Sequence, residues 1–600
     1  MRLAKSPLAF RKQLQWLQLG LLCLFVAVGL AYYRVQILNH DHYEALGEKS
    51  RIKKRVVKAS RGLIYDRHER LITRNLPAYD LVLMRDEMKD RWDDLKPKVS
   101  AFLNVPEDEL HADYQRFRAT LMSLPITIDK DIRFPSVVRV LRNRTQYPGL
   151  NVNTSSRRDY VYPDLFSHVL GYVGEATESE IERDPRVGLG DIVGKRGLEK
   201  SYDAFLTGVD GTRTVQMNSR GFFFSDNVTL DPIPGGNIIV TLDFELQKIA
   251  AEALGSFNGA VLLMDAQSGE LLVFVSAPSF DINRFTRRMS DEEWQALVNQ
   301  PNQPLFNRPI QGLYAPGSIF KVATALAALE SQMVTPETTF FCTGAFEYYG
   351  RVFKCNAGRG HGELDLRGAV QKSCNVYFYQ VADRIGANQI ASMAQRLGFG
   401  KPTGVDLIGE KKGLVPTPKW KKERFNKIWY PGETLSVSIG QGDLQVTPIQ
   451  LVNMMAIVAN MGHGPVPRLV HKLERGSESR YVQTQIQHVD LPESYFRVVR
   501  DGMWAAVNLD QGTGSSAAIK GRDVCGKTGT AQLITFRNDS DRKDTRLMNA
   551  WFAGFAPKNN PEVVVVVLVE HAGGGGVNAA PIAREILEAY FSSHDRIDPI

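Results

Sequence analysis

The 600-residue sequence lacks internal repeats, and its one low-complexity tract is the glycine run at 573–576. With 43% apolar and 23% charged residues, its composition is that of a folded protein, so disorder is not expected. The formal net charge of +7 is small for this length. A mixed solvated surface explains it better than an anionic partner does, and we expect no nucleic-acid partner. Six hundred residues exceed what one hydrophobic core serves, so several domains are predicted.

Long apolar runs are scarce as well. Only one, from about Leu14 to Tyr33, reaches the roughly twenty residues that span a bilayer. Basic residues precede this run, and aromatic residues bracket it. We therefore predict a cytoplasmic tail at 1–13, an uncleaved membrane anchor at 14–34, and the rest of the chain outside the cytoplasm. The run Val563–Val569 is too short to cross a membrane and predicts a buried strand.

A cleaved signal peptide is the alternative at the N-terminus, because Gly29-Leu30-Ala31 loosely resembles a small-x-small cleavage site. The apolar run is longer than the usual apolar core of a signal peptide. We therefore favour the anchor.

Two larger regions follow the anchor. Residues 45–235 are mixed and strongly charged and contain no run of catalytic residue types. Pro232–Gly236 predicts a linker, after which a second domain covers 236–595. Strands at both ends of that domain and helices between them are typical of an α+β fold, with helices covering one mostly antiparallel sheet. The predicted strands are Ala260–Met264, Leu271–Val275, Gly526–Gln532, Ala550–Ala556 and Val563–Glu570, and the predicted helices are Ser318–Ser331, Leu444–Asn460 and Pro581–Phe591.

Ser318 and Lys321 are the strongest candidates for catalysis. Pro316-Gly317 precedes the serine and an apolar run follows it, which predicts a turn feeding a buried helix that begins around Ser318. Residues three apart share a helix face, so we expect Lys321 Nζ to reach Ser318 Oγ. A buried amine with a lowered pKa can take the proton of a serine hydroxyl. The free N–H groups at a helix start suit a developing oxyanion.

Ser318 and Lys321 form an S-x-x-K pattern, which alone is expected roughly twice by chance in a chain of this length. Two further motifs strengthen the assignment. Ser373-Cys374-Asn375 and Lys527-Thr528-Gly529-Thr530 follow Ser318 in the order known from penicillin-binding proteins and class A β-lactamases. A second S-x-x-K match, Ser50–Lys53, has neither a turn before it nor an apolar helix after it. Ser225-Asp226-Asn227 matches the second motif but precedes the nucleophile. We discount this match and the one at Ser50–Lys53.

Together these motifs resemble the serine D,D-transpeptidase family. Residues 236–595 are similar to the catalytic domain of a class B penicillin-binding protein, a fold shared with serine β-lactamases. Residues 45–235 resemble the elongated pedestal (dimerisation-type) domain of that family through Arg61–Arg67, Gly171–Gly174 and Gly197–Tyr202. The resemblance spans nearly the whole chain. It favours the elongation-type members, the penicillin-binding protein 2 group, although division-type members share all three motifs.

The resemblance implies acyl transfer on peptidoglycan stem peptides and lipid-linked precursor peptides, with inhibition by β-lactams. Ser318 would attack the carbonyl between the two terminal D-alanines, and Lys321 would act as its base. Ser373 would pass a proton to the leaving amine, and Asn375 would hold the substrate amide. Backbone N–H groups of Ser318 and Thr530 would form the oxyanion hole. The strand motif would supply catalytic Lys527 and the substrate-binding residues Thr528, Gly529 and Thr530.

Two details of that strand follow from its geometry. Alternation along a strand sends Thr528 to the face opposite Lys527 and Gly529. Gly529 would allow close approach of the substrate.

Potential metal ligands follow the first motif, at Cys342, Cys355, His361 and Cys374, the last of them inside the second motif. Zinc prefers four tetrahedral nitrogen and sulfur ligands, although this spacing matches no short zinc-finger pattern. A Cys342–Cys355 disulfide is the alternative outside the cytoplasm. We favour structural zinc because the resemblance implies zinc at matching positions in some elongation-type members. Such an ion would tie the loop after the Ser318 helix to Ser373, whereas the acyl transfer itself needs no cofactor.

Other functions fit the sequence less well. A membrane β-lactamase would need a base for its deacylating water and would not need the anchor or the pedestal region. A bifunctional synthase would need a glycosyltransferase domain with paired acidic residues, and residues 45–235 show no such match. A penicillin sensor usually has a longer cytoplasmic segment, and a non-catalytic scaffold would not need intact motifs. As partners, the resemblance implies the membrane, a polytopic glycosyltransferase of the rod system and a rod-complex scaffold protein.

Overall fold

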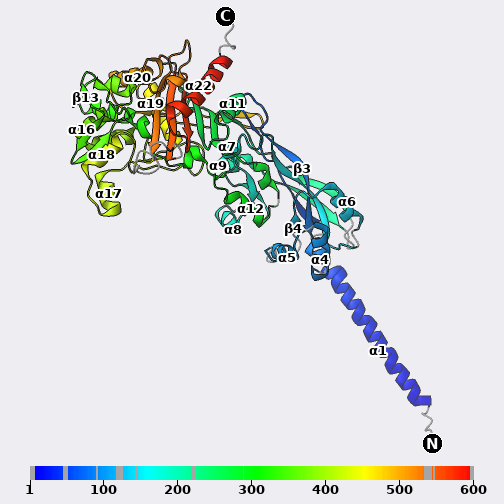
Figure 1. The fold of residues 1–600 in the computed structure, drawn as a ribbon. Coiled ribbons are helices and arrows are strands. Elements are labelled where there is room, and N and C mark those ends of the chain that lie inside the picture. Colours follow the sequence, from blue (N-terminus) through cyan, green and yellow to red (C-terminus); the bar gives the residue numbers. More distant parts are fainter. Residues whose placement is uncertain are drawn as a thin grey trace. The chain divides into compact units, whose positions relative to one another are not determined.

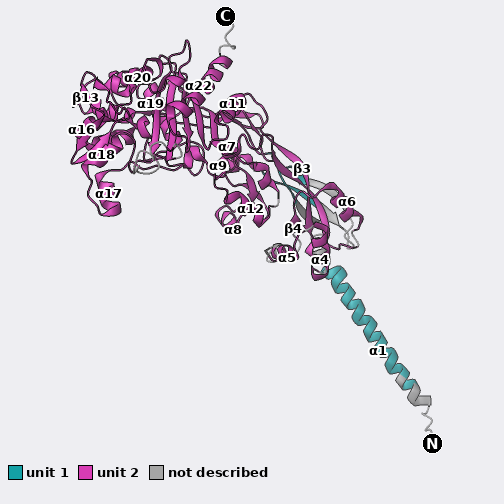
Figure 2. Cartoon of the chain, in the orientation of Figure 1, with its two compact units in different colours: residues 1–60, 208–234 teal, residues 61–207, 235–600 magenta. Residues whose placement is uncertain are grey.

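The computed structural model describes residues 7–44, 52–88, 92–103, 105–116, 126–143, 146–217, 223–287, 289–532, 544 and 547–594. The chain forms two compact units (Figure 2). Unit 1 comprises residues 1–60 and 208–234, and unit 2 comprises 61–207 and 235–600. This division differs from the predicted domains, whose limits at 45, 235 and 595 stay predictions.

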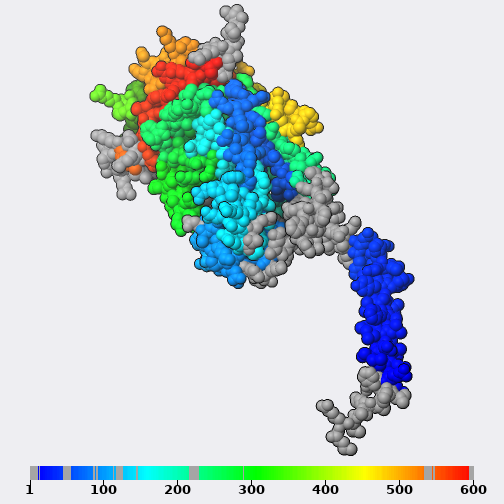
Figure 3. All heavy atoms as spheres, turned by 90° about the vertical axis from the view of Figure 1, so that its right-hand side faces the viewer, coloured from blue at the N-terminus to red at the C-terminus, as the bar shows by residue number. Residues whose placement is uncertain are grey.

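Unit 1 contains an N-terminal helix and a three-stranded antiparallel sheet in the order β1-β8-β9. Helix α1 (Pro7–Tyr33) continues into a π-helical turn. The segment Leu14–Leu38 has a mean hydropathy of 2.0, and none of its apolar window is buried (Figure 3). An exposed apolar helix of this length fits a single-pass membrane anchor. The remaining elements of unit 1 are η1 (Arg34–Leu38), β1 (Ile52–Val57), β8 (Gly211–Met217) and β9 (Phe223–Leu230).

Residues 61–207 of unit 2 form an α+β region on the antiparallel sheet β4-β3-β5. Its short strand β2 pairs in parallel with β10, the first strand after residue 235, so this region and the one that follows share a sheet. The elements are β2 (Ile64–Tyr65), β3 (Thr73–Leu83), α3 (Arg85–Met88), α4 (Trp92–Leu103), α5 (Glu107–Arg116), β4 (Ile126–Asp129), α6 (Phe134–Arg142), β5 (Leu150–Tyr160), α7 (Ser167–Leu170), β6 (Val173–Glu175), α8 (Glu178–Arg183), β7 (Ile192–Gly194), α9 (Gly197–Ser201) and α10 (Asp203–Leu206).

A buried ion-pair cluster joins distant parts of this region. Glu199 on α9 is fully buried and accepts hydrogen bonds from Arg61 Nε at 2.6 Å and from Arg158 Nε at 2.7 Å. The same Arg158 donates to Gly62 O at 2.7 Å. Two of the segments that resemble the pedestal, around Arg61 and Glu199, therefore lie in contact, and Arg158 on β5 completes the Glu199 cluster.

Residues 235–600 contain a five-stranded antiparallel sheet in the order β12-β11-β23-β22-β21, with helices on both faces (Figure 1). The central strand β23 is buried on both sides. Val565 and Val567 pack with α11 and α22, and Val566 and Leu568 pack with the larger helical layer. Strand alternation explains why an uninterrupted valine run faces two cores. The predicted strands of this sheet and its antiparallel order are confirmed.

The strands of this region are β10 (Asn237–Val240), β11 (Gly259–Asp265), β12 (Leu271–Ala277), β13 (Phe340–Cys342), β14 (Ala345–Tyr348), β15 (Arg351–Lys354), β16 (Gly362–Leu364), β17 (His463–Pro465), β18 (Val470–Arg475), β19 (Glu478–Tyr481), β20 (Ile486–His488), β21 (Cys525–Gln532), β22 (Met548–Ala556) and β23 (Val563–Val569). The helices are α11 (Phe244–Leu254), η2 (Ile282–Thr286), α12 (Asp291–Val298), α13 (Arg308–Gln311), η3 (Gly317–Phe320), α14 (Lys321–Glu330), α15 (Leu366–Gln371), α16 (Asn375–Arg396), α17 (Pro418–Phe425), α18 (Pro431–Ser438), α19 (Pro448–Ala459), α20 (Glu493–Asn508), η4 (Ser515–Ala517) and α22 (Gly575–His594).

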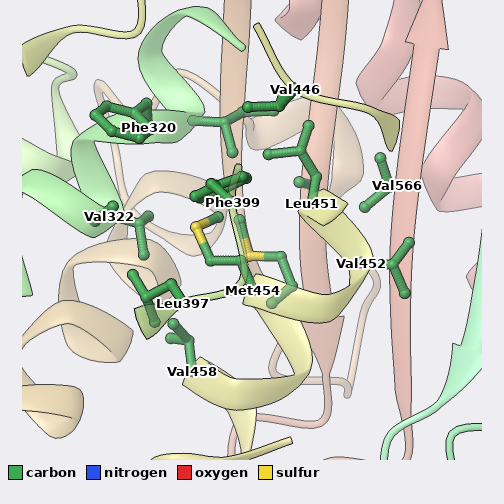
Figure 4. Packing of buried hydrophobic residues seen from close by; sticks show 14 of the residues in the cluster. Phe320, Val322, Leu397, Phe399, Val446, Leu451, Val452, Met454, Val458 and Val566 are labelled. Atoms are coloured by element: carbon green, nitrogen blue, oxygen red, sulfur yellow. The ribbon is translucent and has the colours of Figure 1, made fainter. Parts of the chain in front are cut away.

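Helix α19 supports the site from behind. All twelve of its residues, Pro448–Ala459, are buried, and the helix lies between the sheet and the segment that contains Ser318. Figure 4 shows Met454 of this helix beside Phe399, whose ring packs against that of Phe320, with Val452 facing Val566 of the sheet. A largely apolar helix that is buried on every side belongs in a core, and this one gives the neighbouring segment a rigid base.

Candidate active site

Ser318 lies on the 3-10 turn η3, immediately before α14. The turn packs tightly against β21, and this packing requires glycine at position 317. Gly317 has a φ of +55°, and a Cβ at this residue would lie 2.8 Å from Thr530 O. Gly317 N also donates to Gly440 O at 3.0 Å. The predicted turn and helix are confirmed, with the difference that the serine precedes the α-helix by one tight turn. The half-buried Ser318 is thereby held between β21 and the loop at Gly440.

Lys321, the first residue of α14, is fully buried and points into the second motif. Its Nζ donates to Ser373 O at 2.7 Å and to Asn375 Oδ1 at 2.6 Å, and it lies 3.2 Å from Ser373 Oγ. Among the described residues there is no hydrogen bond between Lys321 Nζ and Ser318 Oγ, contrary to our expectation from helical spacing. The reason lies in tertiary packing, because the acceptors of the second motif bind the Lys321 amine instead.

Ser373 connects the first and third motifs. It lies between α15 and α16 and has a φ of +54°, a left-handed conformation that is uncommon for a residue with a side chain. Its Oγ accepts a hydrogen bond from Lys527 Nζ at 2.8 Å and lies 3.2 Å from Lys321 Nζ. The structure therefore brings Lys321, Ser373, Asn375 and Lys527 together, as the sequence predicts.

Both lysines have lowered pKa values. Burial lowers the pKa of Lys321 to about 8. Burial, and then the charge of Lys321, lower the pKa of Lys527 well below its ordinary value. A neutral lysine has two N–H donors and one lone pair. For Lys321 the two donors match Ser373 O and Asn375 Oδ1, which can only accept. The lone pair then remains for a hydroxyl proton.

Strand β21 holds the third motif at the end of the sheet order, so one of its edges has no strand partner among the described residues. Such an edge can add an extended peptide by backbone hydrogen bonds. Thr528 Oγ1 lies 2.8 Å from Thr513 Oγ1, on the face opposite Lys527, as alternation predicts. Thr530 Oγ1 accepts a long hydrogen bond from Gly575 N at 3.5 Å.

Gly529 has a packing role in addition to the substrate approach that we inferred, which stays a prediction. A Cβ at this position would lie 2.8 Å from Pro316 O and 3.1 Å from the Trp551 side chain. The protein's own packing therefore requires glycine here, because β21 must lie directly against the turn that leads to Ser318.

Sequence reasoning missed two neighbours of the site. Gln441 Nε2 donates to Thr530 O at 3.3 Å, and Thr513 contacts Thr528. Gly440 and Gly442, which both have positive φ values, flank Gln441, so the Gly-Gln-Gly triplet was the available indication of a shaped loop. Nothing in the local sequence around Thr513 indicated its position.

The four potential metal ligands converge on one point. The ligand atoms of Cys342, Cys355, His361 and Cys374 all lie within 4.8 Å of one another. Cys355 Sγ lies 3.9 Å from Cys374 Sγ, and His361 Nδ1 lies 3.6 Å from Cys342 Sγ and 3.5 Å from Cys355 Sγ. Tetrahedral zinc would separate two sulfurs by about 3.8 Å and sulfur from nitrogen by about 3.6 Å. The arrangement fits zinc, and Cys342 and Cys355 are not bonded to each other.

Comparisons with known proteins agree with this geometry. Residues 259–588 match the family model of the penicillin-binding protein transpeptidase domain, and residues 56–240 match that of the penicillin-binding protein dimerisation domain. The peptidoglycan D,D-transpeptidase MrdA of Haemophilus influenzae is 32% identical over 591 residues, which cover 96% of this chain and 90% of the relative. The chain belongs to the penicillin-binding proteins that contain a transpeptidase domain.

Within that family the elongation type is favoured. The peptidoglycan D,D-transpeptidase FtsI of Escherichia coli is 28% identical over 590 residues, a lower identity than the 32% of MrdA. A solved complex of penicillin-binding protein 2 with MreC from Helicobacter pylori matches with a TM-score of 0.80 at 28% identity, covering 90% of this chain and 99% of that one. A structure described as a peptidoglycan synthase complex that coordinates polymerization and crosslinking matches with a TM-score of 0.71 at 30% identity, covering 97% and 98%. The chain is thus a peptidoglycan D,D-transpeptidase, an acyl-transfer serine enzyme, and is similar to the penicillin-binding protein 2 group.

Proposed function

We propose that this transpeptidase cross-links stem peptides during wall elongation through an acyl-enzyme on Ser318. The observation that supports this most directly is the convergence of three separate motifs on Ser373, which contacts both Lys321 and Lys527. Buried Lys321 of α14, Ser373 of the turn before α16 and Lys527 of β21 meet there, and half-buried Ser318 precedes Lys321 by three residues. Burying two amines together is costly, and active sites are where such an arrangement is found.

In the first half-reaction, neutral Lys321 takes the proton of Ser318 as Oγ attacks the carbonyl carbon of the penultimate D-alanine. The Oγ–carbon bond forms, and backbone N–H groups of Ser318 and Thr530 hold the oxyanion. The carbon–nitrogen bond then breaks, and the proton passes from Lys321 through Ser373 Oγ to the leaving D-alanine amine. Asn375 keeps Lys321 in place and binds the substrate amide.

In the second half-reaction, an amine of an acceptor stem peptide attacks the acyl-enzyme, and its proton returns along the same path to Ser318. With water as the acceptor, the same intermediate gives carboxypeptidase activity. Lys527 orients Ser373 and attracts the terminal carboxylate of the donor peptide, while Thr528, Gly529 and Thr530 present the backbone edge along which that peptide lies.

A penicillin tests this mechanism, because its reactive amide acylates the same nucleophile. Intact mass after mixing should show one covalent adduct per chain, and peptide mapping should place it on Ser318. Ser318→Ala should abolish the adduct. Ser50→Ala, at the discounted match that lies outside the described residues, should leave it unchanged. An adduct on any other residue, or none with folded protein, would overturn the mechanism, and rapid release of the drug would indicate a β-lactamase.

We also propose that Cys342, Cys355, His361 and Cys374 hold a structural zinc ion. Cys374 lies between Ser373 and Asn375 in the sequence, and its Sγ accepts a hydrogen bond from Tyr377 N at the start of α16. Bound zinc would fasten that helix start to the β13–β16 segment. The ligands then hold the backbone that aims Ser373 and Asn375 at Lys321, with no open position for a substrate.

Location and partners complete the proposal. The anchor helix would keep its N-terminus in the cytoplasm, where its basic flank belongs, and place the catalytic region outside. The similarity to penicillin-binding protein 2 in its complex with MreC supports a rod-complex scaffold protein as a partner. The similarity to a peptidoglycan synthase complex supports a membrane glycosyltransferase as a second partner.

A further inference from the structure

Helix α17 and the residues after it present a basic surface with exposed apolar side chains. Figure 1 shows α17 projecting beside α18. The side chain of Lys419 is 85% exposed, and Phe425 and Ile428 are 52% and 64% exposed. Glu423 is the one acidic residue in this stretch. The α17 surface consists of Lys419, Lys422, Arg424, Phe425, Lys427 and Ile428, all of them exposed.

The helix that carries this surface is firmly fixed. Thr417 Oγ1 caps it by accepting from Trp420 N at 3.0 Å. Lys421, the one buried basic residue of the helix, pairs with Glu433 at the start of α18, with Nζ 2.6 Å from Oε2. Lys421 therefore stabilises the position of α17 against α18 and is not part of the α17 surface.

The exposed cations are in a different situation. Among the residues that the structure describes, Lys422, Arg424 and Lys427 form no ion pair, and Lys419 approaches Glu423 only at 4.0 Å. Fixed cations without partners on a projecting helix are available to an anion from outside.

The helix that follows the α17 surface, α18 (Pro431–Ser438), contacts the active-site region at both of its ends. At the start of α18, a Cβ on Gly432 would lie 2.9 Å from the ring of Phe353, and the neighbouring Lys354 O accepts from Asn375 Nδ2 at 3.3 Å. At the end of α18, Ser438 O accepts from Thr324 Oγ1 of α14 at 2.8 Å. Helix α18, which follows the α17 surface in the chain, therefore contacts both α14 and the strand next to the second motif.

We propose that the α17 surface binds the peptidoglycan strand that the active site cross-links, a role that rests on the function proposed above. A stem peptide that ends in D-alanyl-D-alanine has a free carboxylate, so a strand with many uncross-linked stems presents many carboxylates along its length. The basic side chains pair with carboxylates of stems next to the reacting one, and Phe425 and Ile428 pack against apolar parts of the strand. The surface thus holds a strand while single stems enter the site.

An anionic lipid surface is the competing partner, because basic residues next to apolar ones are also typical of membrane-binding helices. The contacts of the segment favour the strand, since α18 runs from this surface directly to α14 and the second motif. Vesicles therefore serve as one arm of the test.

The test compares two triple variants of the full-length protein in detergent. One reverses charges on the surface, Lys419→Glu with Lys422→Glu and Arg424→Glu. The matched control reverses three exposed charges elsewhere in the 235–600 region, Lys248→Glu with Lys520→Glu and Arg584→Glu. The probe is soluble uncross-linked glycan strands with pentapeptide stems. The surface variant should bind them roughly tenfold more weakly at low salt, and the control variant as the wild type does. Penicillin should acylate all three proteins at the same rate.

Three results would overturn the proposal. In the first, the surface variant and the control variant bind strands equally well. In the second, the wild type binds strands whose stems have been removed as tightly as intact strands. In the third, the wild type binds phosphatidylglycerol vesicles but no strands. Failure of penicillin to acylate the wild type would instead overturn the proposed function, so the two failures are distinguishable.

Discussion

Lys321 Nζ lies 2.6 Å from Asn375 Oδ1, a hydrogen bond that joins the helix after the nucleophile to the start of α16. Together with the bond to Ser373 O, it satisfies both donors of a neutral lysine. Asn375 therefore does more than hold substrate, because it stabilises the orientation in which the lone pair of Lys321 is free for a proton. Removing this acceptor would leave that N–H with only the longer contact to Ser373 Oγ, at 3.2 Å.

The first prediction concerns pH. Acylation needs neutral Lys321, and burial lowers its pKa to about 8. A base with that pKa is neutral in about one tenth of the molecules at pH 7 and in about nine tenths at pH 9. The acylation rate should therefore rise with pH across this window, measured with a β-lactam whose own charge does not change there. Lys321→Arg should lose acylation at every pH. A flat profile between pH 6 and pH 9 would contradict the assignment of Lys321 as base.

The second prediction concerns Gly529. In Gly529→Ala the new methyl would meet Pro316 O at 2.8 Å, so β21 and the turn before Ser318 must separate by a few tenths of an ångström. Acylation by penicillin should slow by about tenfold or more while the protein stays folded. Gly574→Ala is the matched control, because its Cβ would meet nothing within 4 Å. Equal acylation rates for the two variants would show that the site tolerates this shift.

The third prediction concerns metal. Protein purified without added metal should contain about one zinc per chain by elemental analysis. His361→Ala should lose the ion and lower both the Tm and the acylation rate. The acylation rate should fall because the ligand Cys374 lies between Ser373 and Asn375 in the sequence. Cys525→Ala, which removes a buried cysteine outside the cluster, should keep the zinc. Metal-free protein with only one or two free thiols outside the anchor would refute zinc and support the disulfide.

Motif order predicted which side chains the fold brings together, because each motif is a short segment of sequence. Ser318 with Lys321, Ser373 with Asn375, and Lys527 each lie within four residues of a recognisable neighbour. The five-stranded sheet was predictable for a similar reason, since an uninterrupted valine run such as Val563–Val569 leaves few alternatives to a doubly buried strand.

Contacts between distant segments were not predictable from the sequence. Helical spacing predicted a hydrogen bond between Lys321 and Ser318. Lys321 Nζ instead donates to acceptors more than fifty positions later in the sequence. Arg158 was missed for the same reason, because its partner Glu199 is 41 positions away and nothing near Arg158 marks it. Such pairings depend on tertiary packing, which local patterns do not contain.

The last prediction concerns the Glu199 cluster. Burial raises the pKa of Glu199, but the charges of Arg158 and Arg61 lower it further, so the net shift is downward and the residue stays ionised. A lowered carboxyl pKa contributes stability that is present above the unfolded pKa and is lost as the pH falls. Glu199→Gln would leave two largely buried guanidinium groups without their shared anion, a change that costs roughly 3–5 kcal/mol.

Glu245→Gln is the matched control, since Glu245 pairs with Arg70 at the surface with 65% of its side chain exposed, where a pair is worth about 0–1 kcal/mol. Denaturant unfolding of both variants at neutral pH measures the difference. The gap between Glu199→Gln and wild type should shrink towards acidic pH, because protonation removes the same charge from the wild-type protein. A Glu199→Gln midpoint equal to that of Glu245→Gln would mean that the two arginines find other acceptors, with Gly62 O and Asn75 Oδ1 the nearest for Arg158.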